Sequence, residues 1–360
     1  MPSFDILRKS TPQKTFRVAS VCGTYDLQSD AIEERFVGEI NLPEQWNVGL
    51  IVGRSGTGKT TIAKELFGDV LIEHYEYTHE CLLDDFPSDV SMSDIYKALN
   101  SVGFSSPPSW LKSYHVLSNG EKMRCDLARA IITNKKMFAF DEFTSVVDRT
   151  VAQIGSLAMQ KAIRRQGKKF IAITCHYDVE EWLQPDWIFC TDDMTFHLRE
   201  VQKKNIAINI YEVKKDKERY WNFFKKYHYL SHSFNKAARV FIATYNDNMC
   251  GFCAALPFPH PKRKNVYKEH RTIVLPDYQG VGIGGRFTDY IGHLFHEEGK
   301  SYISTTSHPN MIKARINSKN WKCTHQGRTS SGSDNGKIQN KHKKGSTSCN
   351  RITCSFEYYE

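Results

Sequence analysis

The stretch Gly53-Arg-Ser-Gly-Thr-Gly-Lys-Thr60 decides the expected fold of the first half of the chain. It follows the apolar run Val48–Val52 and leads into Thr61-Ile-Ala-Lys-Glu-Leu-Phe67, so a strand, a turn and a helix are expected in that order. Glycines let backbone N–H groups close on a phosphate, and the lysine reaches its outer oxygens. The pattern predicts a nucleotide site that uses Gly53, Ser55, Gly56, Gly58, Lys59, Thr60 and Thr61, with Thr60 also a Mg²⁺ ligand.

Further motifs follow this loop in a recognisable order. Leu117-Ser-Asn-Gly-Glu-Lys-Met-Arg124 precedes a helical stretch, and Met137-Phe-Ala-Phe-Asp-Glu142 is an apolar strand that ends in two carboxylates. Asp148 and His176 complete the series. The series resembles that of ATP-binding-cassette (ABC) ATPases, in which Walker A, signature, Walker B, D-loop and H-loop occur in this order.

The resemblance implies a role for each of these residues. Asp141 would hold Mg²⁺, because a hard cation takes oxygen ligands, and Glu142 would polarise the attacking water as the general base. His176 would hydrogen-bond the γ-phosphate of ATP. In such ATPases the signature of one protomer covers the nucleotide of the other, so Ser118 and Gly120 imply an ATP-dependent homodimer.

Some positions depart from the family pattern. Asn119 stands where the family usually has glycine, and Glu121 replaces glutamine. Asparagine tolerates left-handed backbone angles, so the turn is expected to survive, while the rate of turnover stays open. No glutamine marks the Q-loop, for which Asp84 and Asp85 are the candidates. Tyr25 is placed where the family has an aromatic residue that stacks on adenine, and a tyrosine in the core of a β-strand is the alternative.

Charge divides the chain into two halves. Residues 1–200 carry 22 Lys and Arg against 28 Asp and Glu, whereas residues 201–360 carry 27 against 12. We therefore expect two domains, 1–200 and 201–360, of which the second is basic and attracts polyanions such as nucleic acid. Lysine-rich clusters lie at residues 203–204, 214–215, 225–226, 262–264 and 341–344. Solvated loops and helix faces are the alternative for any one cluster.

The second half reads as an α+β domain that opens with an alternating strand at residues 206–210. The expected elements are a helix at 216–226, strands at 238–245, 250–256 and 271–275, a helix at 286–298, a strand at 302–306 and a helix at 310–320. With the loop Gln279-Gly-Val-Gly-Ile-Gly284 between strand and helix, this order resembles the GNAT family of acyl-coenzyme A transferases. The resemblance implies that Gln279, Gly280, Gly282 and Gly284 bind the pyrophosphate of acetyl-coenzyme A or another acyl-coenzyme A.

The acceptor side is marked by Trp221-Asn-Phe-Phe-Lys-Lys-Tyr-His-Tyr-Leu-Ser231. This segment resembles the His-Tyr segment of Mom-type proteins, which are GNAT-like enzymes that alter adenine in phage DNA. His228 and Tyr229 are the acid–base candidates, because imidazole and phenol can shuttle the proton that an attacking amine loses. Aromatic packing of a helix is the alternative for Tyr227. Arg271, assigned to the coenzyme site, and Ser307-His308 are candidate contacts of the acyl group or acceptor.

Composition argues against other classes of protein. No run approaches the roughly 20 apolar residues that span a bilayer, and the N-terminus lacks a signal-peptide core, so no membrane partner is expected. The ten cysteines are scattered, which fits reduced thiols and predicts a cytoplasmic protein. For a protein encoded by a phage, this would be the cytoplasm of the host. Cys250-Gly-Phe-Cys253 lacks a second pair, which disfavours zinc. Residues 330–344 are expected to form a basic loop between late strands.

The sequence thus predicts an α/β chain: a P-loop ABC-type ATPase domain followed by a GNAT-like α+β acyl-coenzyme A transferase domain that modifies nucleic acid. Acylation of a protein or a small amine is one alternative. A non-enzymatic, ATP-gated nucleic-acid clamp is the other. The acyl group, the acceptor atom and the general base of acyl transfer stay open.

Overall fold

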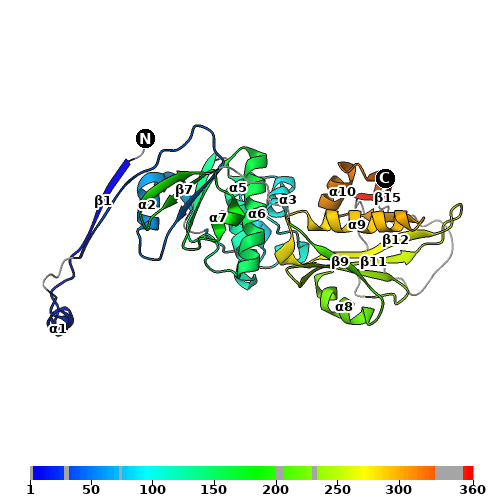
Figure 1. Cartoon of the computed structure of the whole chain (residues 1–360), viewed down its shortest axis with the longest axis horizontal. Coiled ribbons are helices and arrows are strands. Elements are labelled where there is room, and N and C mark those ends of the chain that lie inside the picture. The colour runs from blue at the N-terminus through cyan, green and yellow to red at the C-terminus, as the bar shows by residue number, and fades with distance from the viewer. Residues whose placement is uncertain are drawn as a thin grey trace. The chain divides into compact units, whose positions relative to one another are not determined.

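The computed structural model describes residues 3–27, 32–72, 75–133, 135–199, 206–228, 233–328 and 352–359. The chain divides into two compact units, the first formed by Met1–Phe104 and Ser109–Lys204, the second by Ser105–Pro108 and Asn205–Glu360. Each unit has its own sheet, covered by helices (Figure 1). The mixed α/β fold class expected from the sequence is confirmed.

A six-stranded sheet of order β4-β5-β6-β3-β7-β8 forms the centre of the first unit. Neighbouring strands from β4 to β7 are parallel, and β8 is antiparallel to β7. The strands are β3 (Val48–Val52), β4 (Leu71–Ile72), β5 (Met137–Phe140), β6 (Lys169–Thr174), β7 (Trp187–Cys190) and β8 (Thr195–Leu198). Helices cover a parallel sheet on both faces, which is why all five residues of β3 are apolar or glycine and buried.

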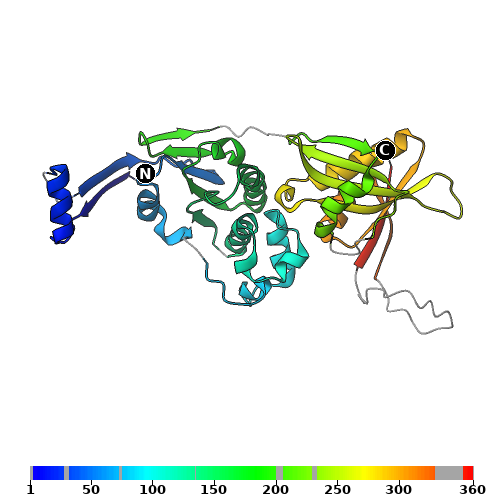
Figure 2. The same ribbon diagram turned by 90° about the horizontal axis from the view of Figure 1, so that it is seen from below.

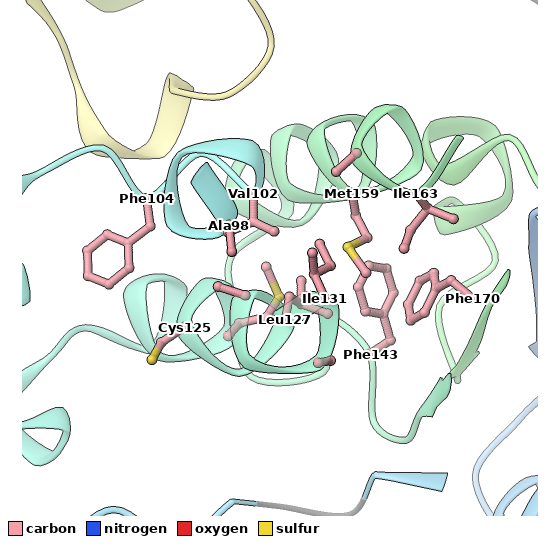
Figure 3. Close-up of a cluster of buried hydrophobic side chains, with 14 of the residues drawn as sticks. Ala98, Val102, Phe104, Cys125, Leu127, Ile131, Phe143, Met159, Ile163 and Phe170 are labelled. Carbon is pink, nitrogen blue, oxygen red and sulfur yellow. The ribbon is translucent and has the colours of Figure 1, made fainter. Parts of the chain in front are cut away.

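Helices and 3₁₀ turns connect these strands. They are α2 (Lys59–Phe67), η1 (Gly68–Val70), η2 (Leu82–Asp85), α3 (Met92–Ser101), α4 (Pro107–Trp110), η3 (Tyr114–Val116), α5 (Asn119–Ile132), α6 (Arg149–Gln166) and α7 (Val179–Leu183). Successive strand residues point to opposite faces, so Leu50 and Ile51 belong to different hydrophobic clusters. Ile51 packs with Ile62 of α2, whereas the Leu50 cluster includes residues of α3, α5 and α6, several of which Figure 3 shows around Phe143.

A two-stranded ribbon precedes this sheet. Strands β1 (Ser3–Ser10) and β2 (Ile32–Glu39) pair antiparallel, and helix α1 (Phe16–Tyr25) lies at the end of the ribbon away from α2 (Figures 1 and 2). At the other end, Phe4 and Phe36 are buried in the cluster of Ile51. The alternative that Tyr25 is a core residue of a β-strand is wrong, because it ends α1 and is 73% exposed.

A seven-stranded sheet of order β14-β15-β13-β12-β11-β10-β9 forms the second unit. Its strands are β9 (Asn209–Val213), β10 (Arg239–Tyr245), β11 (Asn248–Pro257), β12 (Val266–Val274), β13 (Ser301–Thr306), β14 (Trp321–Arg328) and β15 (Ile352–Tyr358). Only β12 and β13 are parallel neighbours. These two strands pair through residues 266–268 and 301–303 and then separate, so their carboxyl-terminal halves share no ladder.

Helices lie on both faces of this sheet as well, with α9 (Ile283–Glu297) and α10 (Pro309–Ile316) on one side and α8 (Lys217–Phe224) on the other (Figure 1). The 3₁₀ turns are η4 (Lys225–Tyr227) and η5 (Pro276–Tyr278). Trp221 and Phe224 of α8 each lie 5.5 Å from the ring of Phe252. On the other face, Phe295 of α9 stacks on Tyr302 at 5.1 Å. Across the described residues, none of the helices combines the length and apolar character that crossing a membrane requires.

The close packing of α9 on β15 generates a stability prediction. A Cβ atom at Gly292 would lie 2.3 Å from the ring of Tyr358, so Gly292→Ala should lower the free energy of unfolding. Overpacking of this kind costs about 1–3 kcal/mol. Gly285→Ala in the same helix is the matched control, because a Cβ there meets nothing within 4 Å and alanine favours a helix. Thermal unfolding compares the two, and equal melting temperatures would contradict the packing described.

Candidate functional site

Three of the sequence motifs meet at one edge of the first sheet. Strands β3, β5 and β6 are parallel, and the P-loop (residues 53–60), Asp141 and His176 follow their carboxyl ends. The backbone N–H of Phe143 donates to the carbonyl of Ile173 over 2.8 Å, which fixes the segment after β5 against β6. Ligands of open parallel sheets bind beyond the carboxyl ends of the strands. The fold therefore brings the P-loop, Asp141 and His176 to the edge where a nucleotide would bind.

The glycines of the P-loop shape a cradle. Gly56 and Gly58 have φ of +86° and +85°, a region that glycine enters without steric cost. A Cβ at Gly58 would lie 2.6 Å from the ring of Phe36, and one at Gly53 would lie 2.2 Å from Thr191 Oγ1, so packing requires both glycines. A Cβ at Gly56 meets no described atom within 4 Å. The loop is thus packed against Phe36 and Thr191 at two glycines and open at Gly56, as phosphate binding requires.

Lys59 is the first residue of α2 and is only 9% exposed. Its Nζ donates to the carbonyl of Arg54 over 2.6 Å, so the ammonium group already lies across the loop. Thr60 and Thr61 follow it in α2, and the Thr61 hydroxyl accepts a hydrogen bond from Arg8 at 3.3 Å. Ser55 is exposed at the tip of the loop. The fit to a triphosphate therefore rests on a positioned cation and an open glycine cradle.

The acidic pair lies in a strained turn after β5. Asp141 Oδ1 accepts from the backbone N–H of Glu142 over 2.8 Å. Glu142 has φ of +53°, in the left-handed region. Such a conformation costs a residue other than glycine about 1–3 kcal/mol, and strain of this kind gathers at functional sites. The turn directs an exposed Glu142 carboxylate away from the core.

Asp192, a residue that no sequence motif marks, joins the P-loop to the segment that carries His176. Its Oδ1 accepts from the backbone N–H of Arg54 at 3.0 Å and from Arg54 Nε at 3.3 Å. Its Oδ2 accepts from the hydroxyl of Tyr177. The bond between Tyr177 and Asp192 raises the pKa of the phenol to about 12 and, with the bonds from Arg54, lowers the pKa of the carboxyl. Asp192 therefore positions two of the motif loops at once.

The signature residues occupy the start of α5. Ser118 accepts from the N–H of Glu121 at 3.3 Å, and Glu121 Oε2 accepts from the N–H and the hydroxyl of Ser118, each at 3.0 Å. Glu121 thus closes a capping box. Asn119 is the first residue of the helix and has no positive φ, so the turn survives the replacement of glycine without left-handed backbone angles. Its side-chain amide instead donates to the carbonyl of Val146 in the D-loop at 3.1 Å.

Other predicted residues lie elsewhere. Within the described residues, no hydrogen bond joins Ser118 or Gly120 to the P-loop. Tyr25 is the last residue of α1, the helix at the remote end of the β1–β2 ribbon (Figure 1). A single chain therefore does not bring these three residues to its own Walker A loop.

Asp85, one candidate for the Q-loop position, is turned inward. Its Oδ1 accepts from the N–H groups of Thr78 and His79 at 2.9 and 3.2 Å and pairs with His79 Nδ1 at 2.8 Å. Burial opposes ionisation, but the bonds from His79 and Thr78 outweigh it, so the pKa of Asp85 lies below its usual value. Asp84 is exposed beside it. Asp148 caps α6 by accepting from the N–H of Thr150 at 2.9 Å.

The second glycine-rich loop leads into α9. Gly280 and Gly282 have φ of +87° and +86°. Gln279 Nε2 donates to the carbonyl of Val274 over 2.8 Å, which fixes the loop to the end of β12. A Cβ at Gly282 meets no described atom within 4 Å, and one at Gly284 meets Val274 at 3.4 Å. The first N–H groups of a helix have no partner within the helix, so the open loop before α9 suits a diphosphate.

A β-bulge in β12 faces Ala254 and Ala255 and places Glu269 beside Thr272. Thr272 Oγ1 donates to Glu269 Oε1 at 2.7 Å. Arg315 NH2 donates to Glu269 Oε2 at 2.6 Å, and these two side chains are only 2% and 11% exposed. Sequence reasoning missed this network, which the run of charged residues within a strand could have indicated. The buried pair fixes β12 to α10 where β12 and β13 separate.

Arg271 lies on the other face of the sheet. It pairs with Ala254, and directly paired residues share a face, so Arg271 lies on the face of Phe252 and α8. His228 is 9% exposed on that face, with its ring 5.9 Å from Trp221. The structure thus brings Arg271 and His228 to one face. Tyr229 lies outside the described residues.

Two further histidines of the second unit are His270, in β12, and His308, which follows β13. Burial and the neighbouring Arg271 lower the pKa of His270 to about 4, so its imidazole is neutral at neutral pH. His308 precedes α10, and burial lowers its pKa as well. Within the described residues no group of three or more His, Cys, Asp or Glu side chains could hold a metal ion, and Cys250 and Cys253 are buried in β11.

The chain matches a known protein family over part of its length. Residues 177–315 match the Acetyltransferase (GNAT) family, so the chain contains a GNAT acetyltransferase domain. Most of this stretch lies in the second unit, whereas residues 177–204 lie in the first. No curated protein sequence matches the chain.

The amino-terminal part has structural similarity to ABC cassettes. A bacterial ABC exporter with ATP bound is 17% identical with a TM-score of 0.34, covering 44% of this chain and 33% of its own. A dimeric bacterial ABC transporter cassette is 15% identical with a TM-score of 0.36, covering 51% of this chain and 94% of its own. A dimeric cassette bound to ADP and phosphate after hydrolysis is 16% identical with a TM-score of 0.34, covering 44% of this chain and 87% of its own. The chain thus spans about a third of the length of that exporter.

The contacts of Asp192 generate a prediction for nucleotide binding. Asp192→Ala removes the acceptor of the Arg54 amide and of Tyr177, so ATP affinity should fall about tenfold or more, as hydrogen bonds to a charged group are among the stronger ones. Asp193→Ala is the matched control, because in the described part of the chain Asp193 bonds to Thr195 at 2.7 Å and to Cys190, both beside the same turn, and not to the P-loop. Calorimetric titration with ATP measures both, and equal affinities would show that Asp192 does not position the loop.

Proposed function

We propose that the protein is an ABC-type ATPase fused to an acyl-coenzyme A-dependent N-acyltransferase that modifies a base of nucleic acid, as Mom-type proteins do. The observation that carries the proposal is the presence of two open glycine cradles, one before α2 and one before α9, each at the start of a helix. The match to the GNAT family supports acyl transfer for the second cradle. The positioned Lys59 supports a triphosphate for the first.

In the ATPase, Lys59 would exchange its bond to Arg54 for oxygens of the β- and γ-phosphates. Thr60 and Asp141 would hold Mg²⁺, which neutralises charge on the phosphates. Glu142 would polarise the attacking water, and His176 would bond the γ-phosphate. Ser118 and Gly120 of a second copy would complete the site. This arrangement explains why one chain does not bring its own signature to its P-loop.

In the acyltransferase, the backbone N–H groups of residues 280–284 would bind the pyrophosphate of acetyl-coenzyme A or another acyl-coenzyme A. The edges of β12 and β13 that share no ladder can accept an extended chain that carries amide groups. The acceptor nitrogen attacks the thioester carbonyl, the C–N bond forms, the C–S bond breaks and the thiolate leaves. The nitrogen loses its proton to a base, for which His228 and Tyr229 are the candidates.

Nucleic acid is the acceptor that the charge favours. Residues 201–360 carry 27 Lys and Arg against 12 Asp and Glu, and a domain with such an excess attracts polyanions. A protein or small amine as acceptor, or a clamp that binds nucleic acid without transfer, would each give a different outcome in the assays below.

The paired nucleotide site is tested with Glu142→Gln. This variant should bind ATP, fail to hydrolyse it and accumulate as a dimer, because the closed state no longer loses its γ-phosphate. Gel filtration in saturating ATP reads the change. The double variant Lys59→Ala/Glu142→Gln is the control and should stay monomeric. A monomeric Glu142→Gln protein would contradict the shared site.

Acyl transfer is tested by incubating the full chain with labelled acetyl-coenzyme A, ATP and duplex DNA, followed by mass spectrometry of the nucleosides. We expect an acetylated base, and loss of both coenzyme A binding and product in Gly282→Asp, because the new carboxylate repels the pyrophosphate. Gly299→Asp is the matched control: its φ of +66° and open surroundings resemble those of Gly282, but it lies beyond the other end of α9. Label on protein alone would favour the protein acceptor, and binding without transfer would favour the clamp.

A further inference from the structure

The turn between β11 and β12 concentrates positive charge on one small surface. Residues 257–268 contain Lys262, Arg263, Lys264 and Lys268 and no Asp or Glu. Residues 261–265 are all exposed. Arg263 pairs with Glu357, whereas no described acidic side chain forms an ion pair with the three lysines. We call residues 257–268 the basic turn; three of its four cations are left for a partner.

The basic turn has a defined shape. Prolines occupy positions 257, 259 and 261, and each fixes its own φ. The N–H of Phe258 donates to the carbonyl of Val266 over 2.8 Å, and His260 pairs with Arg263 through an antiparallel bridge. His260 Nδ1 accepts from the N–H of Lys262 at 3.2 Å. Less conformational freedom therefore remains to be lost when this surface binds a partner.

An aromatic side chain accompanies the charge. Phe258 is 37% exposed, and Lys268 Nζ lies 5.1 Å above its ring. Phe258, Pro261 and Lys264 are among the residues that line a shallow hollow of about 600 Å³. The surface thus combines cations with an exposed ring, a composition that suits a ligand with phosphates and flat bases or sugars.

A second hollow of the same unit is less suited to a polyanion. It has a volume of about 480 Å³ and is lined by Lys214, Lys217 and Lys236 together with Asp216 and Glu218. Lys236 pairs with Glu218 at 3.1 Å, and Lys217 Nζ donates to the carbonyl of Ala238. Its cations are therefore offset by carboxylates, unlike those of the basic turn.

We propose that the basic turn is the surface on which duplex DNA docks, with the two-stranded ribbon of β11 and β12 entering the major groove. The major groove of B-form DNA is about 12 Å wide and admits a two-stranded ribbon, whereas that of A-form RNA is narrow and deep. Lys262, Lys264 and Lys268 contact phosphates on the groove walls. This inference rests on the proposed function, since it names the surface through which the nucleic-acid acceptor is held.

The test uses the full chain with Lys262→Ala/Lys264→Ala and fluorescence anisotropy on a duplex DNA between 50 and 200 mM salt. Each phosphate contact contributes about 0.9 to the slope of log affinity against log salt, so the variant should lose about 2 from the slope and bind roughly ten- to a hundredfold more weakly at the low-salt end. Lys214→Ala/Lys236→Ala removes the same charge from the second hollow and should leave the slope unchanged. Coenzyme A binding should be the same in both variants, which shows that they are folded.

The outcomes separate the two proposals. If the wild type does not bind the duplex at 50 mM salt, the nucleic-acid acceptor fails and the docking surface fails with it. If the wild type binds and the basic-turn variant keeps the slope, or the control loses as much, the acceptor stands and the docking surface is wrong. Equal affinity for an RNA duplex, with an equal loss in the variant, would rule out entry into the major groove.

Discussion

The first unit depends on the burial of β3 within a parallel sheet. Every residue of this strand is buried, and its neighbours β6 and β7 hydrogen-bond it on both sides. Burial on two faces leaves only the strand's ends for polar chemistry, so the P-loop emerges at a point that cannot shift without disturbing both clusters. Because β5 and β6 run in the same direction, their carboxyl ends bring Asp141 and His176 to that point. The proposed nucleotide site thus follows from strand direction as well as from its side chains.

A second network links the signature helix to the segment that follows β4. Asp126 of α5 accepts from the hydroxyls of Tyr77 and Tyr114 at 2.6 and 2.8 Å, and burial raises the pKa of this carboxyl. The two tyrosine rings stack at 3.7 Å, and Arg129 lies 4.6 Å above the ring of Tyr77. With Asn119 bonded to Val146, α5 is thereby attached at its first turn to the D-loop and along its length to residues 75–77. A movement of either segment would therefore also move α5.

Sequence reasoning predicted the parts of this structure that depend on the pattern of neighbouring residues. The P-loop, the apolar strand before Asp141 and the glycine loop before α9 combine glycines, apolar runs and helix periodicity over a few residues, so their elements could be predicted. Contacts between distant residues could not. Asp192 meets Arg54 across 138 positions, and Arg315 meets Glu269 across 46, and neither pair has a spacing that a motif could record. Strand β12 starts at Val266, five residues before the predicted start, because its charged residues are accommodated by a bulge and a buried ion pair.

The boundary between the units has a practical consequence for dividing the chain into fragments. The family match begins at residue 177, ahead of β7, yet β7 pairs with β3 in the first sheet and buries Trp187, Ile188 and Phe189 there. A fragment that started at the first matched residue would carry β7 and β8 away from their partner strand. Their apolar surfaces and unpaired backbone would then face water, and strands in that condition aggregate. A fragment that started at Asn205 would leave both sheets whole, so the chain should be cut where the sheets end and not where the family similarity begins.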